Sequence, residues 1–185
     1  MAAAAALRVS EHVECARILV VDDDEGLHGD YDRALREDRI ERDALDGARQ
    51  DLFGTAVALR SNQGIQLDIV HAYRGESAVE LVRESLAEGR RFSLAFVDMR
   101  MPPGCNGIET IKAVWSVDPA VHVVLCTAYS DFTWATVLAE VGTGAGIHLM
   151  RKPFDAEQVR VFAQVLAKKW LLAHTRPRLP SFVGG

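Results

Sequence analysis

The sequence predicts an α/β fold in which helices cover both faces of a parallel sheet. Five short apolar segments of strand length occur along the chain, and amphipathic segments with helical periodicity separate them. The first, third and fourth short segments are apolar almost throughout, as expected of strands that are buried on both faces. We therefore expect one compact domain built on a five-stranded parallel sheet, with these three strands at its centre.

Each expected element has its own sequence signal. The strands are bounded by turn or polar residues and are expected at 17–21, 66–70, 93–97, 122–126 and 146–150. Helical periodicity predicts helices at 76–89, 107–119, 131–142 and 155–174. The first of these helices should bury a face that contains Val79, Leu81, Val82 and Leu86 and should end at Gly89, and Asp155 is the expected N-cap of the last.

One connection is longer than a single helix and two short loops require. About 45 residues separate Asp23 from the second strand near Leu67. Apolar residues recur in it at helical spacing, so we expect a helical insertion at about 38–63. This insertion either packs on the edge of the domain or forms a surface for a partner or a second copy of the chain, and the sequence leaves both interpretations open.

Composition restricts the classes of function. The chain has 185 residues, of which 49% are hydrophobic and 25% charged, and a net charge of −5, which is typical of a globular domain and unfavourable for direct binding of nucleic acid. No apolar stretch approaches the roughly 20 residues of a membrane span. The cysteines Cys15, Cys105 and Cys126 lack metal-ligand spacing, which favours reduced thiols and a cytoplasmic protein. The six histidines also lack ligand spacing, and we expect them on the surface or at sheet edges.

Polar residues follow four of the five expected strands. Asp22 and Asp23 follow the first, Asp98 the third, Thr127 the fourth and Lys152 the fifth. With the strand order 2-1-3-4-5, these side chains would meet in one shallow cleft, because ligands of open parallel sheets bind beyond the carboxyl ends of the strands. Three carboxylates so close together need a cation, and oxygen ligands of this kind suit Mg²⁺.

Four motifs then give the chain a family resemblance. "ILVVDDDE", "FVDMRMP", "LCTAYSD" and "RKPF", in that order, resemble the response-regulator receiver domain of two-component signalling over about residues 16–172. A looser resemblance is to receivers within larger signalling proteins, such as hybrid histidine kinases. The family resemblance implies a flavodoxin-like sheet of order 2-1-3-4-5.

The resemblance also implies roles for individual residues. Asp98 would accept a phosphoryl group from a histidine kinase or a histidine phosphotransfer protein. Mg²⁺, or Mn²⁺ in its place, would be held by Asp22, Asp23, Asp98 and the backbone carbonyl of Arg100. Lys152 would pair with a phosphoryl oxygen and Thr127 would hydrogen-bond another, so that the cleft acts as a phosphorylation-controlled switch and not as a metabolic enzyme.

The sequence departs from the family pattern at three places. The loop after Asp98 is one residue longer between its proline and its glycine, and Leu149 stands where the family usually has an aromatic residue coupled to the threonine. Arg100 and Tyr129 are expected to line the route of the hydrolytic water. The family commonly has a cis peptide bond before the residue equivalent to Pro153, which we therefore expect here.

The sequence also predicts the domain boundaries and leaves one rival function open. We expect an N-terminal extension over residues 1–15, a receiver domain over 16–173 and a tail or the start of a linker over 174–185. We also expect the chain to be a piece of a larger protein and homodimerisation to be a further interaction. The rival is a haloacid-dehalogenase-like, Mg²⁺-dependent phosphatase, with Asp22 as nucleophile and Asp24, Thr127 and Lys152 beside it. That family needs a further acidic pair after the lysine, and the sequence offers only Asp155 and Glu157 at an expected helix start.

Overall fold

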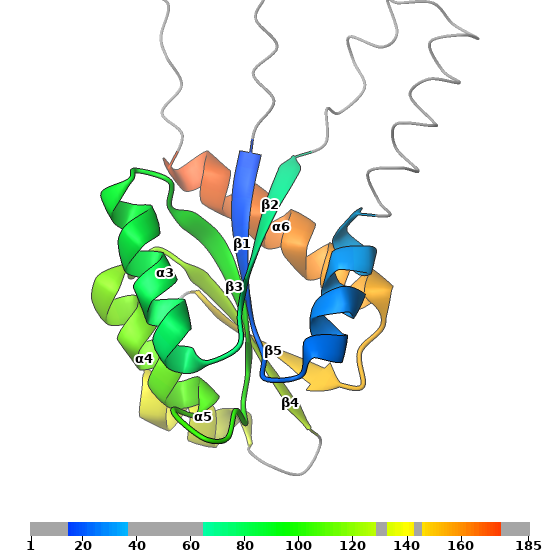
Figure 1. Cartoon of the computed structure of the whole chain (residues 1–185), viewed down its shortest axis with the longest axis vertical. Coiled ribbons are helices and arrows are strands. Elements are labelled where there is room, and N and C mark those ends of the chain that lie inside the picture. Colours follow the sequence, from blue (N-terminus) through cyan, green and yellow to red (C-terminus); the bar gives the residue numbers. More distant parts are fainter. Residues whose placement is uncertain (1–14, 37–64, 129–132, 143–145, 175–185) are drawn as a thin grey trace, which may run out of the picture.

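The computed structural model describes residues 15–36, 65–128, 133–142 and 146–174. Within these ranges, five parallel strands form one sheet of order β2-β1-β3-β4-β5, which confirms the fold and the strand order predicted from the sequence (Figure 1). The strands are β1 (Cys15–Val21), β2 (Gln66–Ala72), β3 (Phe92–Asp98), β4 (His122–Ala128) and β5 (Ile147–Lys152). Because β1, β3 and β4 are the inner strands, they have the longest apolar runs.

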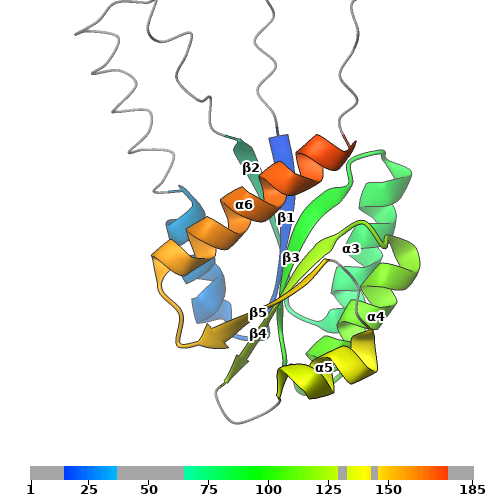
Figure 2. The same cartoon turned by 180° about the vertical axis from the view of Figure 1, so that it is seen from behind.

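Helices cover both faces of the sheet. One face carries α3 (Gly75–Ala87), α4 (Gly107–Val117) and α5 (Trp134–Val141), whereas the other carries α6 (Ala156–His174) and a first helix that begins at Glu25 and is described to Arg36 (Figures 1 and 2). Among the described residues, no helix is both long enough and apolar enough to cross a membrane.

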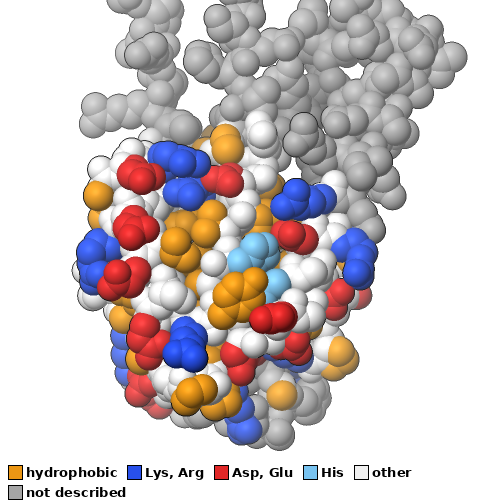
Figure 3. All heavy atoms as spheres, viewed as in Figure 1, with side chains coloured by type: hydrophobic (Ala, Val, Ile, Leu, Met, Phe, Trp, Pro, Cys, Tyr) orange, Lys and Arg blue, Asp and Glu red, His pale blue; other side chains and the backbone are white. Residues whose placement is uncertain are grey.

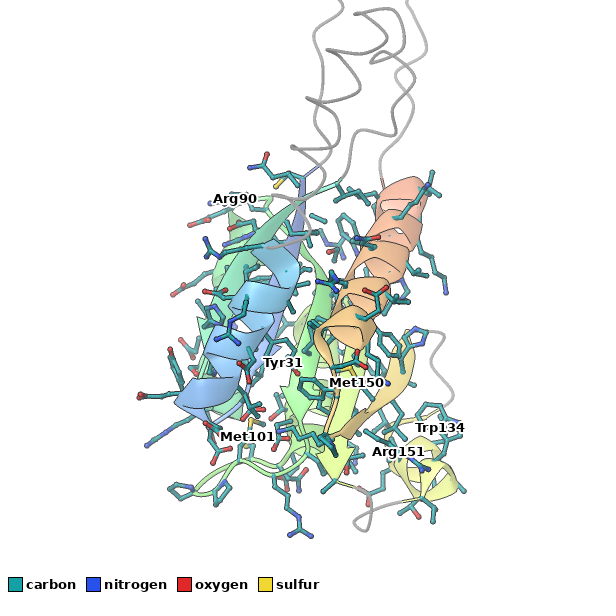
Figure 4. The ribbon with its side chains drawn as sticks, turned by 90° about the vertical axis from the view of Figure 1, so that its right-hand side faces the viewer. Tyr31, Arg90, Met101, Trp134, Met150 and Arg151 are labelled. Carbon is teal, nitrogen blue, oxygen red and sulfur yellow. The ribbon has the colours of Figure 1, made fainter. Side chains whose placement is uncertain are left out.

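The alternation of side chains along the strands builds two cores. Leu19, Val97 and Leu125 point toward α3, α4 and α5, whereas Phe96 and Val124 point toward the first helix and α6. Tyr31 of the first helix and Met150 of β5 lie in the second of these cores (Figure 4). All seven residues of β3 are buried, so this strand is covered on both faces and its carboxyl end has a rigid position.

The helix termini follow the sequence signals. Asp155 caps α6, because its side chain accepts a hydrogen bond from the amide of Gln158 at 2.8 Å. Gly89 follows α3 with a φ of 71°, a conformation that favours glycine. The expected apolar face of α3 was partly wrong: Leu86 is 36% exposed, and the buried residues of this helix include Ala78 and Ser85. Small residues occupy that face because α3 packs closely on α4, where Gly75 lies against Thr110.

Some expectations fall outside the described residues. The insertion at 38–63 and most of the N-terminal extension and the tail belong to this group, as does Tyr129. Because β2 pairs with β1 in parallel, the chain that joins them has to return from the carboxyl end of β1 to the amino end of β2, and a long connection is consistent with that path.

Candidate functional site

Four strand ends meet at one edge of the sheet. Asp22 follows β1 directly, while Asp98 is the last residue of β3 and Lys152 the last of β5. Thr127 lies near the end of β4. Since β3 pairs with both β1 and β4, Asp98 occupies the centre of this edge, as the sequence predicts.

Lys152 joins the two buried carboxylates of the site. Its ammonium nitrogen lies 2.5 Å from Oδ1 of Asp98 and 2.9 Å from Oδ2 of Asp22. Asp22 is only 2% exposed and Asp98 7%, whereas the side chain of Lys152 is 24% exposed. The ammonium from the end of β5 therefore bridges two carboxylates that lie at the ends of β1 and β3.

Asp23 completes a cluster of three carboxylates. One oxygen each from Asp22, Asp23 and Asp98 lies within 4.8 Å of the other two, and Asp23 faces solvent. Three carboxylate oxygens, two buried and one accessible, fit a hard divalent cation that keeps several waters, which is the usual mode of Mg²⁺ binding. The donor set would also accept Mn²⁺.

Burial and hydrogen bonding set the charge states of the site. Burial raises the pKa of Asp98 above its ordinary value, and the nearby charge of Asp22 adds to this effect. The Lys152 ammonium and the Arg100 amide act in the opposite direction without cancelling it. For Lys152, burial would lower the pKa, but the hydrogen bonds and charges of Asp98 and Asp22 outweigh burial and hold the pKa above its ordinary value.

The loop after β3 is held against the strand end. The amide of Arg100 donates to Oδ2 of Asp98 at 2.8 Å, and the amide of Gly107 donates to the carbonyl of Met99 at 2.9 Å. Asn106 and Glu109 form a capping box that starts α4, so the longer loop still leads into a regular helix. The role of the Arg100 carbonyl as a metal ligand stays a prediction.

A β-carbon on Gly107 would meet the carbonyl oxygen of Asp98 and the α-carbon of Met99. This position therefore requires glycine because the backbone of α4 passes so close to the end of β3.

Three further expectations concern Thr127, the peptide bond before Pro153 and Leu149. Thr127 is buried, and its hydroxyl donates to the carbonyl of Ala128 at 3.2 Å, so its contact with a phosphoryl group stays a prediction. The Lys152–Pro153 peptide bond is cis, as expected. Leu149 packs against the core next to α5 and pairs with Leu125 of β4.

Sequence reasoning missed His28. This histidine was expected on the surface or at a sheet edge, but it lies buried on the first helix: it is 5% exposed and donates through Nε2 to the backbone carbonyl of Asp22 at 2.8 Å. Its spacing from Tyr31 and Leu35, which are buried on the same face of the first helix, is the signal that could have placed it there.

Two acidic residues that were considered for the rival phosphatase site serve as helix caps. Oδ1 of Asp24 accepts a hydrogen bond from the amide of Gly26 at 2.8 Å, and Asp155 caps α6. Both carboxylates thus have a local structural role outside the cleft, and Asp98, which that site would leave unused, lies at its centre.

The strand order and this arrangement of acids and lysine define the receiver class of signalling domain. The chain belongs to the response regulator receiver domain family, whose model matches residues 52–164. The match begins after Asp22 and Asp23, and the structure joins β1 to the matched part by pairing it with β2 and β3. Receiver domains of response regulators take phosphoryl groups from histidine kinases or phosphotransfer proteins, so the chain is a component of two-component signalling.

Known relatives and structures agree with this assignment. The transcriptional regulatory protein ZraR of Escherichia coli K12 is 34% identical over 113 residues, which cover 61% of this chain and 22% of the relative. Sporulation initiation phosphotransferase F of Bacillus subtilis is 27% identical over 113 residues, 60% of this chain and 82% of the relative. The chain thus spans less than a quarter of the ZraR relatives.

Solved structures show the same fold. A CheY-like response regulator receiver domain from Methanospirillum hungatei superposes with a TM-score of 0.58 at 16% identity, covering 86% of this chain and 99% of that chain. A signal receiver domain of an HD domain-containing protein from Pseudomonas fluorescens has a TM-score of 0.60 at 16% identity, covering 94% of this chain and all of that chain. The comparisons give no support to the phosphatase alternative.

Proposed function

We propose that Asp98 accepts a phosphoryl group from a phosphohistidine of a histidine kinase or a phosphotransfer protein, with Mg²⁺ held at the neighbouring carboxylates. The observation that carries this proposal is the bridge of Lys152 between Asp98 and Asp22 at the carboxyl edge of the sheet. Asp22, Asp23, Asp98 and the carbonyl of Arg100 would hold the metal ion, which when bound offsets negative charge on the transferring group.

The transfer itself needs little besides position and charge. A carboxylate oxygen of Asp98 forms a bond to phosphorus while the bond from phosphorus to the partner's imidazole nitrogen breaks, and the imidazole takes up the electron pair. Lys152 already lies at hydrogen-bonding distance from Asp98, so a small shift lets it pair with an oxygen of the attached group. Thr127 would hydrogen-bond another of these oxygens.

The phosphorylated site would act as a switch for an output elsewhere. Inward movement of Thr127 would alter the surface built by α5, β5 and α6. On α6, Val161, Val165 and Leu172 are exposed apolar residues that a second copy of the chain or a connected domain could cover. We assign residues 16–173 to the receiver unit, with an N-terminal extension before it and a linker after it, and place it with its kinase in the cytoplasm as a regulator without an enzymatic output of its own.

Phosphorylation can be tested directly with a small-molecule phosphodonor. The protein is incubated with Mg²⁺ and acetyl phosphate, and its intact mass is measured. We expect one phosphate adduct on the wild type and none on Asp98→Ala. Asp30→Ala, which removes an exposed carboxylate of the first helix, should keep the adduct.

An adduct that persists in Asp98→Ala would overturn the proposal. Continuous release of phosphate from other esters, dependent on Asp22 but unaffected by Asp98→Ala, would instead identify the phosphatase.

A further inference from the structure

A chain of hydrogen bonds runs from the metal-site turn to the surface beside β2. His28 Nε2 contacts the carbonyl oxygen of Asp22 at 2.8 Å, and His28 Nδ1 lies 2.6 Å from Nδ1 of His71. His71 Nε2 in turn lies 3.1 Å from Oδ1 of Asp32. Figure 3 shows histidine side chains beside hydrophobic atoms on the face that carries β2.

The acceptors at the two ends of this chain determine its hydrogens. The carbonyl of Asp22 and the carboxylate of Asp32 can only accept, so each outer imidazole nitrogen must carry a hydrogen. His71 lies between His28 and Asp32, so the contacts connect the Asp22 carbonyl to a carboxylate of the first helix.

The surroundings protect the bond to Asp22 from water. His28 is 5% exposed, and its ring lies 4.4 Å from that of Tyr73, centroid to centroid, and 4.7 Å from that of His71. A hydrogen bond in such a buried environment is stronger than the same bond exposed to water.

The hydrogen bond from His28 also gives the last polar atom of Asp22 a partner. Its amide donates to the carbonyl of Ala72 at 3.2 Å, its Oδ1 accepts from the amide of Asp24 at 3.0 Å and its Oδ2 binds Lys152. His28 supplies the partner of the remaining polar atom, the backbone carbonyl. This carbonyl is the link to Asp23, so its orientation determines how the next carboxylate faces the cleft.

We propose that His28, supported by His71 and Asp32, is a positioning residue that orients the Asp22–Asp23 turn for binding a divalent cation. This inference rests on the proposed function, because it assigns the metal to the same carboxylates. Outer groups that orient metal ligands affect affinity by about 10-fold to 100-fold when they are removed. His28 acts through a backbone carbonyl, so we expect an effect at the lower end of that range.

Two substitutions at His28 separate positioning from simple packing. His28→Leu fills the space without a donor, whereas His28→Gln can still donate an N–H to the Asp22 carbonyl. We expect Mg²⁺ affinity, measured by calorimetric titration, to fall roughly tenfold in His28→Leu and to recover largely in His28→Gln. His148→Leu, which replaces a half-buried histidine of β5 at the opposite edge of the sheet from β2, should bind Mg²⁺ like the wild type.

Asp32→Asn provides a test that does not alter the core, since the Asp32 side chain is 35% exposed. It replaces the carboxylate that accepts a hydrogen bond from His71 with an amide, which is a weaker acceptor, and we expect a several-fold loss of Mg²⁺ affinity with little change in thermal unfolding. It therefore remains informative if His28→Leu does not fold. Wild-type affinity in Asp32→Asn together with equal affinities of the two His28 variants would overturn the inference.

The failure of this inference can be distinguished from failure of the proposed function. A wild type that binds no Mg²⁺ and accepts no phosphoryl group would contradict the function itself. A wild type that does both, beside a His28→Leu variant with unchanged Mg²⁺ affinity, would contradict only the positioning role.

Discussion

The ammonium group of Lys152, at the end of an edge strand, contacts the carboxylate of Asp98, at the end of the central strand, at 2.5 Å. Residues 54 positions apart in the chain thereby form the centre of the site. The same ammonium reaches Asp22, so one lysine compensates two buried negative charges. Because these charges are buried, removing one of them should change the free energy of unfolding by a measurable amount.

Removal of Lys152 should destabilise the protein most strongly in the absence of divalent cations. Lys152→Ala leaves Asp22 and Asp98 buried without their cation, and we expect a loss of about 2 kcal/mol in the free energy of unfolding, less than for a fully buried pair because the lysine is partly exposed. Urea unfolding with and without Mg²⁺ measures this loss, and Mg²⁺ should restore more stability in the variant than in the wild type.

Lys112→Ala is the matched control for that experiment. Lys112 pairs with Glu140 at 3.4 Å, and both side chains are exposed, so its removal should change stability by at most about 0.5 kcal/mol. Equal losses of unfolding free energy in the two alanine variants would show that the Lys152 bridge stabilises the fold no more than an exposed ion pair does.

Neutralisation of Asp98 should stabilise the fold at neutral pH. Because burial raises the pKa of Asp98, the folded state binds its proton more tightly than the unfolded state does, and this contribution to stability is lost as the pH rises through the folded pKa. The neutral side chain of Asp98→Asn avoids this loss of stability. Without Mg²⁺, we therefore expect the variant to melt about 2 to 4 °C above the wild type at pH 7, which is the shift that roughly 1 kcal/mol produces in a domain of this size.

The effect of Asp98→Asn on stability should depend on pH. The stability advantage of Asp98→Asn should shrink as the pH falls through the raised pKa of folded Asp98 and should be lost below the ordinary carboxyl value of about 4. Thermal melts across this range measure the difference, and a variant that is less stable than the wild type at pH 7 would contradict the argument.

Two glycines that differ in their surroundings test the approach of α4 to the site. Gly107→Ala would push a methyl group into the carbonyl of Asp98, so we expect a loss of about 2 kcal/mol or more and weaker phosphorylation by acetyl phosphate. Gly29→Ala, in the first helix, meets no described atom within 4 Å and should stabilise the fold by up to about 1 kcal/mol. Chemical unfolding distinguishes the two, and comparable stability of both variants would exclude the close contact.

Asp118 and Arg91 form an ion pair at the opposite end of the sheet. Asp118 is 1% exposed, and Arg91 Nε donates to its Oδ2 at 2.9 Å. Burial would raise the pKa of Asp118, but the hydrogen bonds from Arg91 and from the amide of Ala120 hold it below its ordinary value. We therefore expect Asp118→Asn to cost about 3 kcal/mol at pH 7.

The effect of Asp118→Asn should depend on acidity. The contribution of Asp118 is present above the pKa of the unfolded state and is lost as the pH falls through the folded pKa, so the difference from wild type should narrow below about pH 4. Glu157→Gln, at an exposed ion pair on α6, should show neither the loss nor its pH dependence in the same unfolding series.

Much of the architecture could be predicted because local patterns and the sheet agree. The apolar run of β3 is buried along its whole length, and Asp155 and Gly89 mark helix ends where the sequence placed them. The prediction failed at Leu86 and His28, where a hydrophobic residue lies outside and a polar one inside. Periodicity alone cannot determine such positions, because they depend on how closely a neighbouring helix approaches and on whether a buried polar atom finds a partner.

The sequence by itself determined the number of strands and the identity of the side chains at their ends, because parallel strands place their carboxyl ends along one edge of the sheet, while the strand order followed from the family resemblance. Only the tertiary structure decided which of these groups touch. The bridge from Lys152 to Asp22 and Asp98, the contact of Gly107 with the end of β3 and the burial of His28 each join segments distant in the chain. Such contacts depend on the twist of the sheet and the packing of helices against it, which no local pattern encodes.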